Sequence, residues 1–174
     1  MRHKKERKNA MEETFNITVE MLKVKGACAS GMRDFLKEFP REQYPDGADY
    51  QEVLNRCAEH KRPNYAEWLL NEFGATNTTL SVDEINTDGY VFFAGRIEAR
   101  GKIRCKAIMA GRGIEAGRDI KAGRDIKAGE DFCVYAGLAV RLSYKSQYAQ
   151  ITSKEKPANI ICGEWVPFDD ACGD

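Results

Sequence analysis

The chain has 174 residues, which is enough for one domain or two small ones with a core of their own. Lys and Arg total 27 and Asp and Glu total 27, so the net charge is zero and argues against a bulk attraction to nucleic acid. A mean hydropathy of −0.55 and the lack of a long apolar run predict a soluble protein rather than a membrane-spanning one.

The two ends of the chain are polar. The first ten residues, MRHKKERKNA, are basic, and no apolar segment of the signal-peptide type follows them, so we expect no secretion signal. We predict a disordered basic tail at 1–15 and a frayed acidic tail at 169–174. Both Met1 and Met11 stay open as the start of translation.

The cysteines do not have the spacing of a metal site. No pair shows the CxxC spacing, and the only histidines are His3 and His60. We therefore expect no metal or cofactor, and we expect buried free thiols. The six cysteines are Cys28, Cys57, Cys105, Cys133, Cys162 and Cys172.

Residues 16–74 have the pattern of a small helical unit. A short apolar helix over 19–24 should end at Gly26, and a stripe of apolar residues over 28–39 predicts a second helix that Pro40 stops. The pairs Asp49/Glu52 and Asn64/Glu67 have capping-box spacing and predict two further helices, the last of which ends at Gly74. Trp68 lies on an apolar stripe, which favours a core position.

After Gly74 the pattern changes to short strands. Thr78 to Ile85 alternates and is rich in β-branched residues. Three hexads then follow over 112–129, RGIEAG, RDIKAG and RDIKAG, and looser copies precede them from Phe92 to Gly111. Ile and Ala stand two residues apart and point to the same side of a strand, whereas the Glu or Lys between them points to water. Gly follows, where the chain turns sharply.

This repeat predicts a parallel β-solenoid from Tyr90 to Leu142, with about three rungs of about eighteen residues. That length places Arg100 near Arg118 and Lys106 near Arg124. It also places Arg112, Arg118 and Arg124 on three different corners instead of in one ladder. Steps of five residues, as between Ile103 and Ile108, indicate shortened corners or bulges.

The open ends of a solenoid are sheet edges and need caps. We expect the helical unit to cover one end. Two strand-like runs, Tyr148 to Ser153 and Asn159 to Trp165, flank a turn and predict a C-terminal β-hairpin over the other end. The predicted class is therefore α+β, with a helical unit at 16–74 and a capped solenoid at 76–168.

The hexads resemble two families with β-helices. One comprises the hexapeptide acyltransferases, which use a catalytic histidine in the solenoid. No histidine lies between Arg62 and Asp174, so we expect no enzyme. The other is the bactofilin type, which forms polymers and which the run GYVFFAGRIEARGKIRCKAI resembles.

The chain also resembles prophage proteins of enteric bacteria from about Ile17 to Leu142. The resemblance rests on ITVEMLKVKGACASGMRDFLKEFP, WLLNEFG and AIMAGRGIEAGRDIKAGRDIKAG. That group has a similar front unit before differing repeats. The resemblance implies a phage origin and the cytoplasm of a bacterial host.

Three functions stay open. The first is a non-enzymatic phage protein that binds a host protein or protein complex, for example as an anti-CRISPR-like inhibitor of a defence system. The second is bactofilin-like self-association through the solenoid edges. The third is nucleic-acid binding through a basic rung, because residues 96–131 contain ten Lys or Arg and six Asp or Glu. The candidate binding surface is Arg96, Arg100, Lys102, Arg104 and Lys106.

Overall fold

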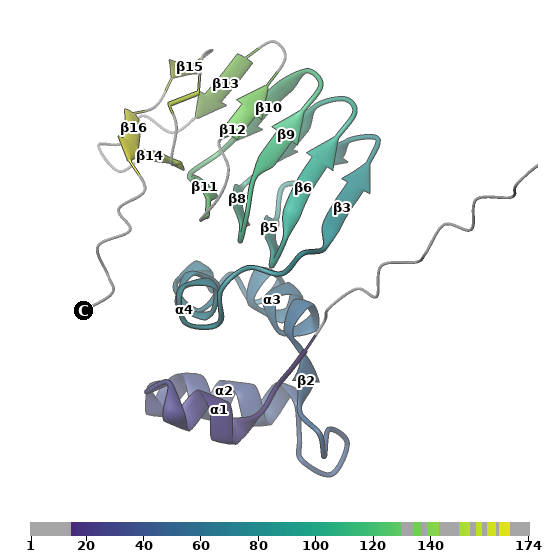
Figure 1. The fold of residues 1–174 in the computed structure, drawn as a ribbon, viewed down its shortest axis with the longest axis vertical. Coiled ribbons are helices and arrows are strands. Elements are labelled where there is room, and N and C mark those ends of the chain that lie inside the picture. The colour runs from purple at the N-terminus through teal and green to yellow at the C-terminus, as the bar shows by residue number, and fades with distance from the viewer. Residues whose placement is uncertain are drawn as a thin grey trace, which may run out of the picture.

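The computed structural model describes residues 15–129, 134–136, 139–142, 150–153, 156–157, 160–162 and 164–167. A group of helices lies beside a stack of short parallel strands (Figure 1). The predicted tails fall outside the described residues, apart from Phe15, whose ring lies 4.9 Å from that of Tyr50. The α+β class with a solenoid is confirmed.

The predicted helices are present in the front unit. The chain forms β1 (Asn16–Ile17), α1 (Val19–Val24), α2 (Ala29–Glu38), β2 (Ala48–Asp49), α3 (Tyr50–Glu59) and α4 (Pro63–Phe73). Strands β1 and β2 pair antiparallel and join the start of the unit to the start of α3.

Capping explains most of the helix ends. The side chains of Thr18 and Asp49 accept hydrogen bonds from the third residue of their helices. Gly74 adopts a φ of 73° at the end of α4, a conformation that favours glycine. The predicted cap at Asn64 is wrong, because Pro63 already occupies the first helical position.

The core of this unit is built around Tyr50. Its ring is 1% exposed, and its hydroxyl donates toward the carbonyl oxygens of Leu69 and Gly74, each at 3.1 Å. This bonding satisfies the buried phenol and ties α3 to the end of α4. Trp68 is half-buried: its ring packs against the same core and meets Phe73 edge-on at 6.2 Å.

The second part is a three-sided parallel solenoid of about four turns. The first side comprises β3 (Thr79–Val82), β6 (Arg96–Ala99), β9 (Ile114–Ala116) and β12 (Val134–Ala136). The second side comprises β4 (Ile85–Asn86), β7 (Ile103–Cys105), β10 (Asp119–Ala122), β13 (Ala139–Leu142) and β15 (Ile160–Cys162). The third side comprises β5 (Tyr90–Phe93), β8 (Ala107–Ala110), β11 (Ile126–Ala128), β14 (Gln150–Ser153) and β16 (Glu164–Pro167).

The Ile-x-Ala pattern points inward as predicted. Ile97 pairs in register with Ile114, and Ile103 with Ile120, and all four side chains are at most 1% exposed. Stacked columns of isoleucine and alanine therefore fill the interior. This burial is the main stabilising contribution of the repeat.

The step between turns is 17 residues from Ile97 to Ile114 and 18 from Ile108 to Ile126. The shorter step corrects one predicted neighbour, because Gly117 and not Arg118 lies beside Arg100. The predicted proximity of Lys106 and Arg124 is confirmed, since the Arg124 amide donates to the Lys106 carbonyl at 2.7 Å. The three repeat arginines lie on three different corners, as predicted: Arg112 before β9, Arg118 before β10 and Arg124 before β11.

The predicted C-terminal hairpin is wrong. Strands β14 and β16 pair in parallel, and β15 pairs in parallel with β13. Ile151 pairs in register with Ile126 and Ile160 with Val140, and both isoleucines pack in or against the interior cluster, so the parallel winding continues through β14, β15 and β16. With a first turn that already begins at Thr79, the solenoid exceeds the three predicted rungs.

The helices pack mainly along the third side of the solenoid. The prediction that the helical unit covers an open end of the solenoid is therefore wrong. Phe92 and Met109 occupy outward positions on β5 and β8, yet each is 2% exposed because the helical unit covers them. One turn further along, the Lys127 ammonium on β11 lies 2.6 Å from the Glu67 carboxylate of α4. Figure 1 shows α3 and α4 next to the ends of β5, β8 and β11.

A helical side chain, that of Gln51, reaches the open edge of the first turn. The Gln51 amide on α3 donates to the Phe92 carbonyl at 2.8 Å and accepts from the Ala94 amide at 2.9 Å. These backbone groups point away from β8, so Gln51 replaces the missing neighbouring strand.

In the part of the chain that the structure describes, no helix is long and apolar enough to span a bilayer.

Candidate binding surfaces

The five basic residues of the candidate surface do not form one patch. Arg96 lies on the first side, where its guanidinium is 2.7 Å from Glu98 and 2.6 Å from Glu115. Because Arg96 bridges two carboxylates and its side chain is 30% exposed, it contributes little free positive charge. Arg100 and Lys102 lie at the next corner, and Arg104 and Lys106 lie on and beyond the second side.

An acidic segment of the first turn faces the basic turn. Asp83 lies 3.2 Å from Arg100, Glu84 3.9 Å from Lys102 and Asp88 3.9 Å from Arg104. Such exposed pairs add little stability, but they cancel much of the local field. The predicted basic rung is thus largely neutralised by the turn stacked beside it.

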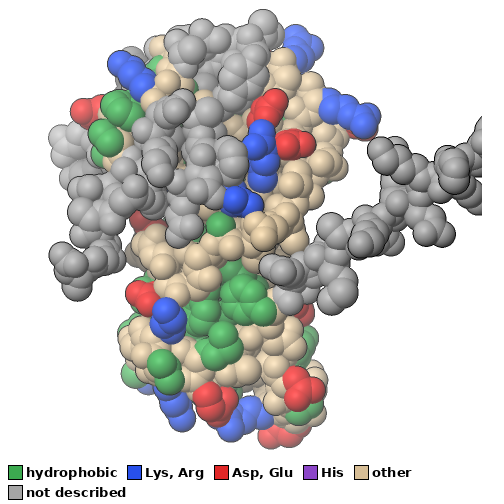
Figure 2. Space-filling view, in the orientation of Figure 1, with side chains coloured by type: hydrophobic (Ala, Val, Ile, Leu, Met, Phe, Trp, Pro, Cys, Tyr) green, Lys and Arg blue, Asp and Glu red, His purple; other side chains and the backbone are tan. Residues whose placement is uncertain are grey.

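A cleft of about 450 Å³ opens in the helical unit, between the α1–α2 pair and the α3–α4 pair. Its inner wall is apolar and buried, and its rim carries charges of both signs. Hydrophobic side chains gather over the helical unit on the face seen in Figure 2, with charged ones around them. The apolar wall includes Leu22, Phe35, Phe39, Val53, Cys57 and Leu69, and the polar rim includes Asp34, Glu38, Arg56, His60 and Arg62.

Weak polar contacts join the two walls of the cleft. His60 Nε2 lies 3.3 Å from Glu38 Oε1, and Arg62 lies 3.9 Å from Asp34. The Tyr65 hydroxyl donates to the same Asp34 carboxylate at 3.4 Å, and the Arg62 guanidinium sits 5.6 Å from the Tyr65 ring centre. Exposed contacts of this kind are individually worth little, so a ligand can rearrange them at small cost.

Cys28 lines the same cleft and caps α2. Hydrogen bonds from the Ser30 hydroxyl and the Gly31 amide lower the pKa of its thiol below the usual value. Burial instead raises the pKa of Cys57 and that of Cys105 to about 12. The expectation of buried thiols is therefore right for Cys57 and Cys105 and wrong for Cys28, which is exposed.

The side chains of the other three cysteines lie outside the described part of the structure. They are Cys133, Cys162 and Cys172.

We expect Cys28 to react with iodoacetamide near neutral pH while Cys57 and Cys105 stay unmodified in the folded protein. The thiolate is the reacting species, so a lowered pKa moves the midpoint of the rate–pH profile below that of an ordinary thiol. Replacing Ser30 with alanine should move this midpoint upward. Peptide mass spectrometry measures the three rates, and equal labelling of Cys28 and Cys57 would contradict the assignment.

The geometry suits binding of an apolar group. The volume lies within the usual range of ligand pockets, and the wall is apolar with polar groups at the mouth. Cys28 hydrogen-bonds to Ser30 and Gly31, whereas His60 pairs with Glu38, so the thiol and the imidazole are engaged separately. Among the described residues, no group of three or more His, Cys, Asp or Glu side chains is placed to hold a metal ion.

The cleft was not predicted from the sequence, because it arises from the packing of two helix pairs. The available signal was small: Gly26, Ala27 and Gly31 interrupt the apolar stripe of α1 and α2 with residues that leave space.

Comparison with known proteins separates the two parts of the chain. Residues 11–77 match the family model of the YdhT N-terminal domain. The match ends just before β3, so it includes the helical unit with its cleft and leaves out the solenoid. Neither the curated proteins nor the solved structures include a significant match to this chain.

Proposed function

We propose that this chain is a non-enzymatic, phage-encoded accessory protein that binds a host protein through the cleft of its helical unit. The cleft carries this proposal, because it is an apolar, half-open cavity with a rim of readily rearranged charges. A partner segment that inserts one or two apolar side chains would fill it and leave a polar rim around the contact.

Two features favour a protein segment over a small metabolite. Val24, at the end of α1, is 86% exposed and does not line the cleft, so the helical unit presents a further apolar side chain outside the cavity. The rim carries both signs of charge and suits a peptide backbone with mixed side chains better than a single charged ligand.

The modular arrangement supports the phage setting. The matched family model covers the helical unit alone, which fits a recognition module joined to differing scaffolds. Within this proposal, the partner is a bacterial protein complex, and inhibition of a defence system by occlusion is the specific form that we put forward. Occlusion needs a rigid body and no chemistry, and the solenoid supplies the rigid body.

The test compares two matched substitutions on α2. Gly31→Met directs a longer side chain into the cleft, where a Cβ would meet only the Cys28 sulfur at 3.4 Å. Ala29→Met places the same side chain on the exposed start of α2, outside the cleft. Partners captured from an enteric bacterial lysate by the tagged wild type are identified, purified and titrated against both variants.

We expect Gly31→Met to weaken binding of the purified partner by about ten-fold or more and Ala29→Met to leave it unchanged. The partner should also protect Cys28 from alkylation. Equal affinity of the two variants, together with unprotected Cys28, would show that the cleft is not the binding surface.

The open edges of β3 and β4 favour one second candidate, self-association through the solenoid ends. Among the described residues, each of these strands has a parallel neighbour on one side only. The acidic residues Asp83, Glu84 and Asp88 border this edge and would repel a second copy stacked head to head. Sedimentation at two concentrations decides the matter, because a fixed small species at both removes self-assembly.

A further inference from the structure

We propose that the outer face of the second side binds the phosphate backbone of nucleic acid. This binding site goes beyond the proposed function and does not depend on it. The proposal rests on a column of cations that runs across successive turns of the solenoid. Most of the cations on this face differ from the residues of the predicted basic rung, which lie within one turn.

The column is defined by strand register. Arg104 on β7 pairs with Lys121 on β10, and Lys121 pairs with Arg141 on β13. Adjacent strands of a sheet are about 4.8 Å apart, so these positions follow one another along the solenoid axis. The side chains of Arg104 and Lys121 are exposed. Duplex DNA carries one negative charge per about 1.7 Å of its axis, so the exposed side chains of Arg104 and Lys121 would each have a phosphate within reach.

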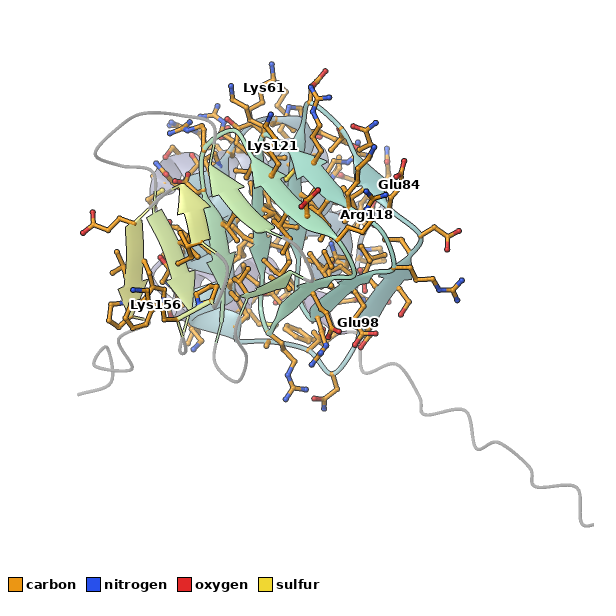
Figure 3. All side chains as sticks on the ribbon, turned by 90° about the horizontal axis from the view of Figure 1, so that it is seen from above. Lys61, Glu84, Glu98, Arg118, Lys121 and Lys156 are labelled. Atoms are coloured by element: carbon orange, nitrogen blue, oxygen red, sulfur yellow. The ribbon has the colours of Figure 1, made fainter. Side chains whose placement is uncertain are left out.

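Further cations border this column at the two corners. Lys106 and Arg124 are stacked at the corner between the second and third sides, where the Arg124 amide donates to the Lys106 carbonyl at 2.7 Å. Arg118 lies at the corner between the first and second sides. Figure 3 shows Lys121 and Glu98 on different sides of the solenoid.

Carboxylates near this face gather at its first turn. Asp88 lies 3.9 Å from Arg104, and Glu84 lies 3.9 Å from Lys102. Asp119, the first residue of β10, and Asp125, at the corner just before β11, are both half-buried. No carboxylate within the described residues lies within 4.0 Å of the charged nitrogens of four cations on this face. These cations are Lys106, Arg118, Lys121 and Arg124.

On the first side of the solenoid, two like charges lie opposite each other and a side chain of opposite charge neutralises them. Glu98 and Glu115 are also in register on adjacent strands, and the Arg96 guanidinium bridges them at 2.7 and 2.6 Å. Like charges directly opposite each other in a sheet are destabilising. Arg104 and Lys121 repeat this arrangement with positive charge, and no carboxylate bridges them among the described residues. An anionic ligand would supply the missing bridge.

The composition of the face favours nucleic acid over an acidic protein. Asn86 on β4 is the register neighbour of Arg104 in the first turn, so the outward positions Asn86, Arg104 and Lys121 of this side offer no aromatic or aliphatic side chain as an anchor. Protein interfaces depend on such anchors and are poor in lysine. Contacts from Lys and Arg to phosphates need none, and they should read no base sequence.

The test measures binding of a generic 20-base-pair duplex by fluorescence anisotropy at several salt concentrations. Wild type should bind at low salt, and log K should fall with log salt at a slope that reports about three to five phosphate contacts. The double variant Lys106→Glu/Lys121→Glu should lose about ten-fold or more in affinity at low salt, with a slope smaller by about two.

The control is Lys23→Glu/Arg33→Glu, which makes the same change in net charge at exposed positions on α1 and α2. It should bind like wild type, and both variants should keep the wild-type unfolding temperature. The proposal is overturned if wild type does not bind the duplex at low salt, or if the control loses as much affinity as the test variant. Equally tight binding of polyglutamate by wild type would assign the face to acidic proteins and overturn it as well.

Discussion

Replacing Phe92 with alanine is expected to lower the free energy of unfolding by about 3–5 kcal/mol, the usual cost of deleting a buried phenylalanine side chain. Phe92 points away from the solenoid interior, yet it is 2% exposed because the helical unit covers it. Its removal leaves a cavity between the two parts of the protein. Urea unfolding followed by circular dichroism measures the change.

The two tryptophans add a second readout for this variant. Trp68 lies on α4 and Trp165 on β16, one in each part of the protein. We expect the helical unit of Phe92→Ala to unfold at lower urea than the solenoid, which separates the two signals. The control Val24→Ala truncates an apolar side chain that is 86% exposed, and it should change stability by less than about 0.5 kcal/mol. A small effect of Phe92→Ala would contradict the packing along the third side.

The second large effect concerns a repeat glycine. Gly117→Ala should lower the free energy of unfolding by about 1–3 kcal/mol, the usual cost of overpacking. A Cβ at this position would overlap the Arg100 carbonyl oxygen of the neighbouring turn. Gly123 occupies the same place in the next hexad, but a Cβ there would lie 3.2 Å from the Lys106 carbonyl oxygen.

The comparison of Gly117→Ala with Gly123→Ala isolates the close approach between turns, because hexad position and side chain are the same. Neither glycine has a positive φ, so loss of backbone freedom does not explain a difference. Urea denaturation of the two variants measures it. Equal stability of the two variants would contradict the spacing of the turns at this corner.

The solenoid itself could be predicted from the sequence, because its local rule repeats. Ile and Ala two residues apart must share a face of a strand, and Ile114, Ile120 and Ile126 are each at most 1% exposed. The helix ends at Gly26 and Gly74 were equally readable, since both glycines adopt positive φ. The repeat glycines lie at sharp turns as expected, but the turns need no positive φ; at Gly111, Gly117 and Gly129 a Cβ would instead overlap the backbone of the neighbouring turn.

The placement of the helices could have been inferred from one exception to the repeat. Outward positions are polar on β3, β4, β6, β7, β9, β10 and β11, as at Glu98 and Lys121, but β5 and β8 carry Phe92 and Met109 there. An apolar residue on both faces of a strand indicates a strand covered on both sides. Which element covers it depends on tertiary packing, and the sequence pattern does not specify it.

Which basic residues become neighbours on the solenoid depends on the exact number of residues per turn. A step of 18 residues aligns Arg100 with Arg118, whereas the observed step of 17 aligns Arg104 with Lys121. One residue per turn therefore decides which cations stack. The five-residue step from Ile103 to Ile108 marks the shortened corner in the sequence, and the register confirms it, because Ile103 pairs with Ile120 whereas Ile108 pairs with Ile126. Arg141 pairs with Lys121 only after a longer step.

The central claim is that the helices cover the third side and leave the cleft and the second side free. Carbodiimide cross-linking of the native protein, read by peptide mass spectrometry, tests it directly. We expect a Lys127–Glu67 cross-link, because the ammonium and carboxylate lie 2.6 Å apart. The exposed Lys102–Glu84 pair, whose two residues both belong to the solenoid, is the control. Cross-links of Lys127 to solenoid carboxylates alone, in a sample where Lys102–Glu84 has formed, would contradict this arrangement.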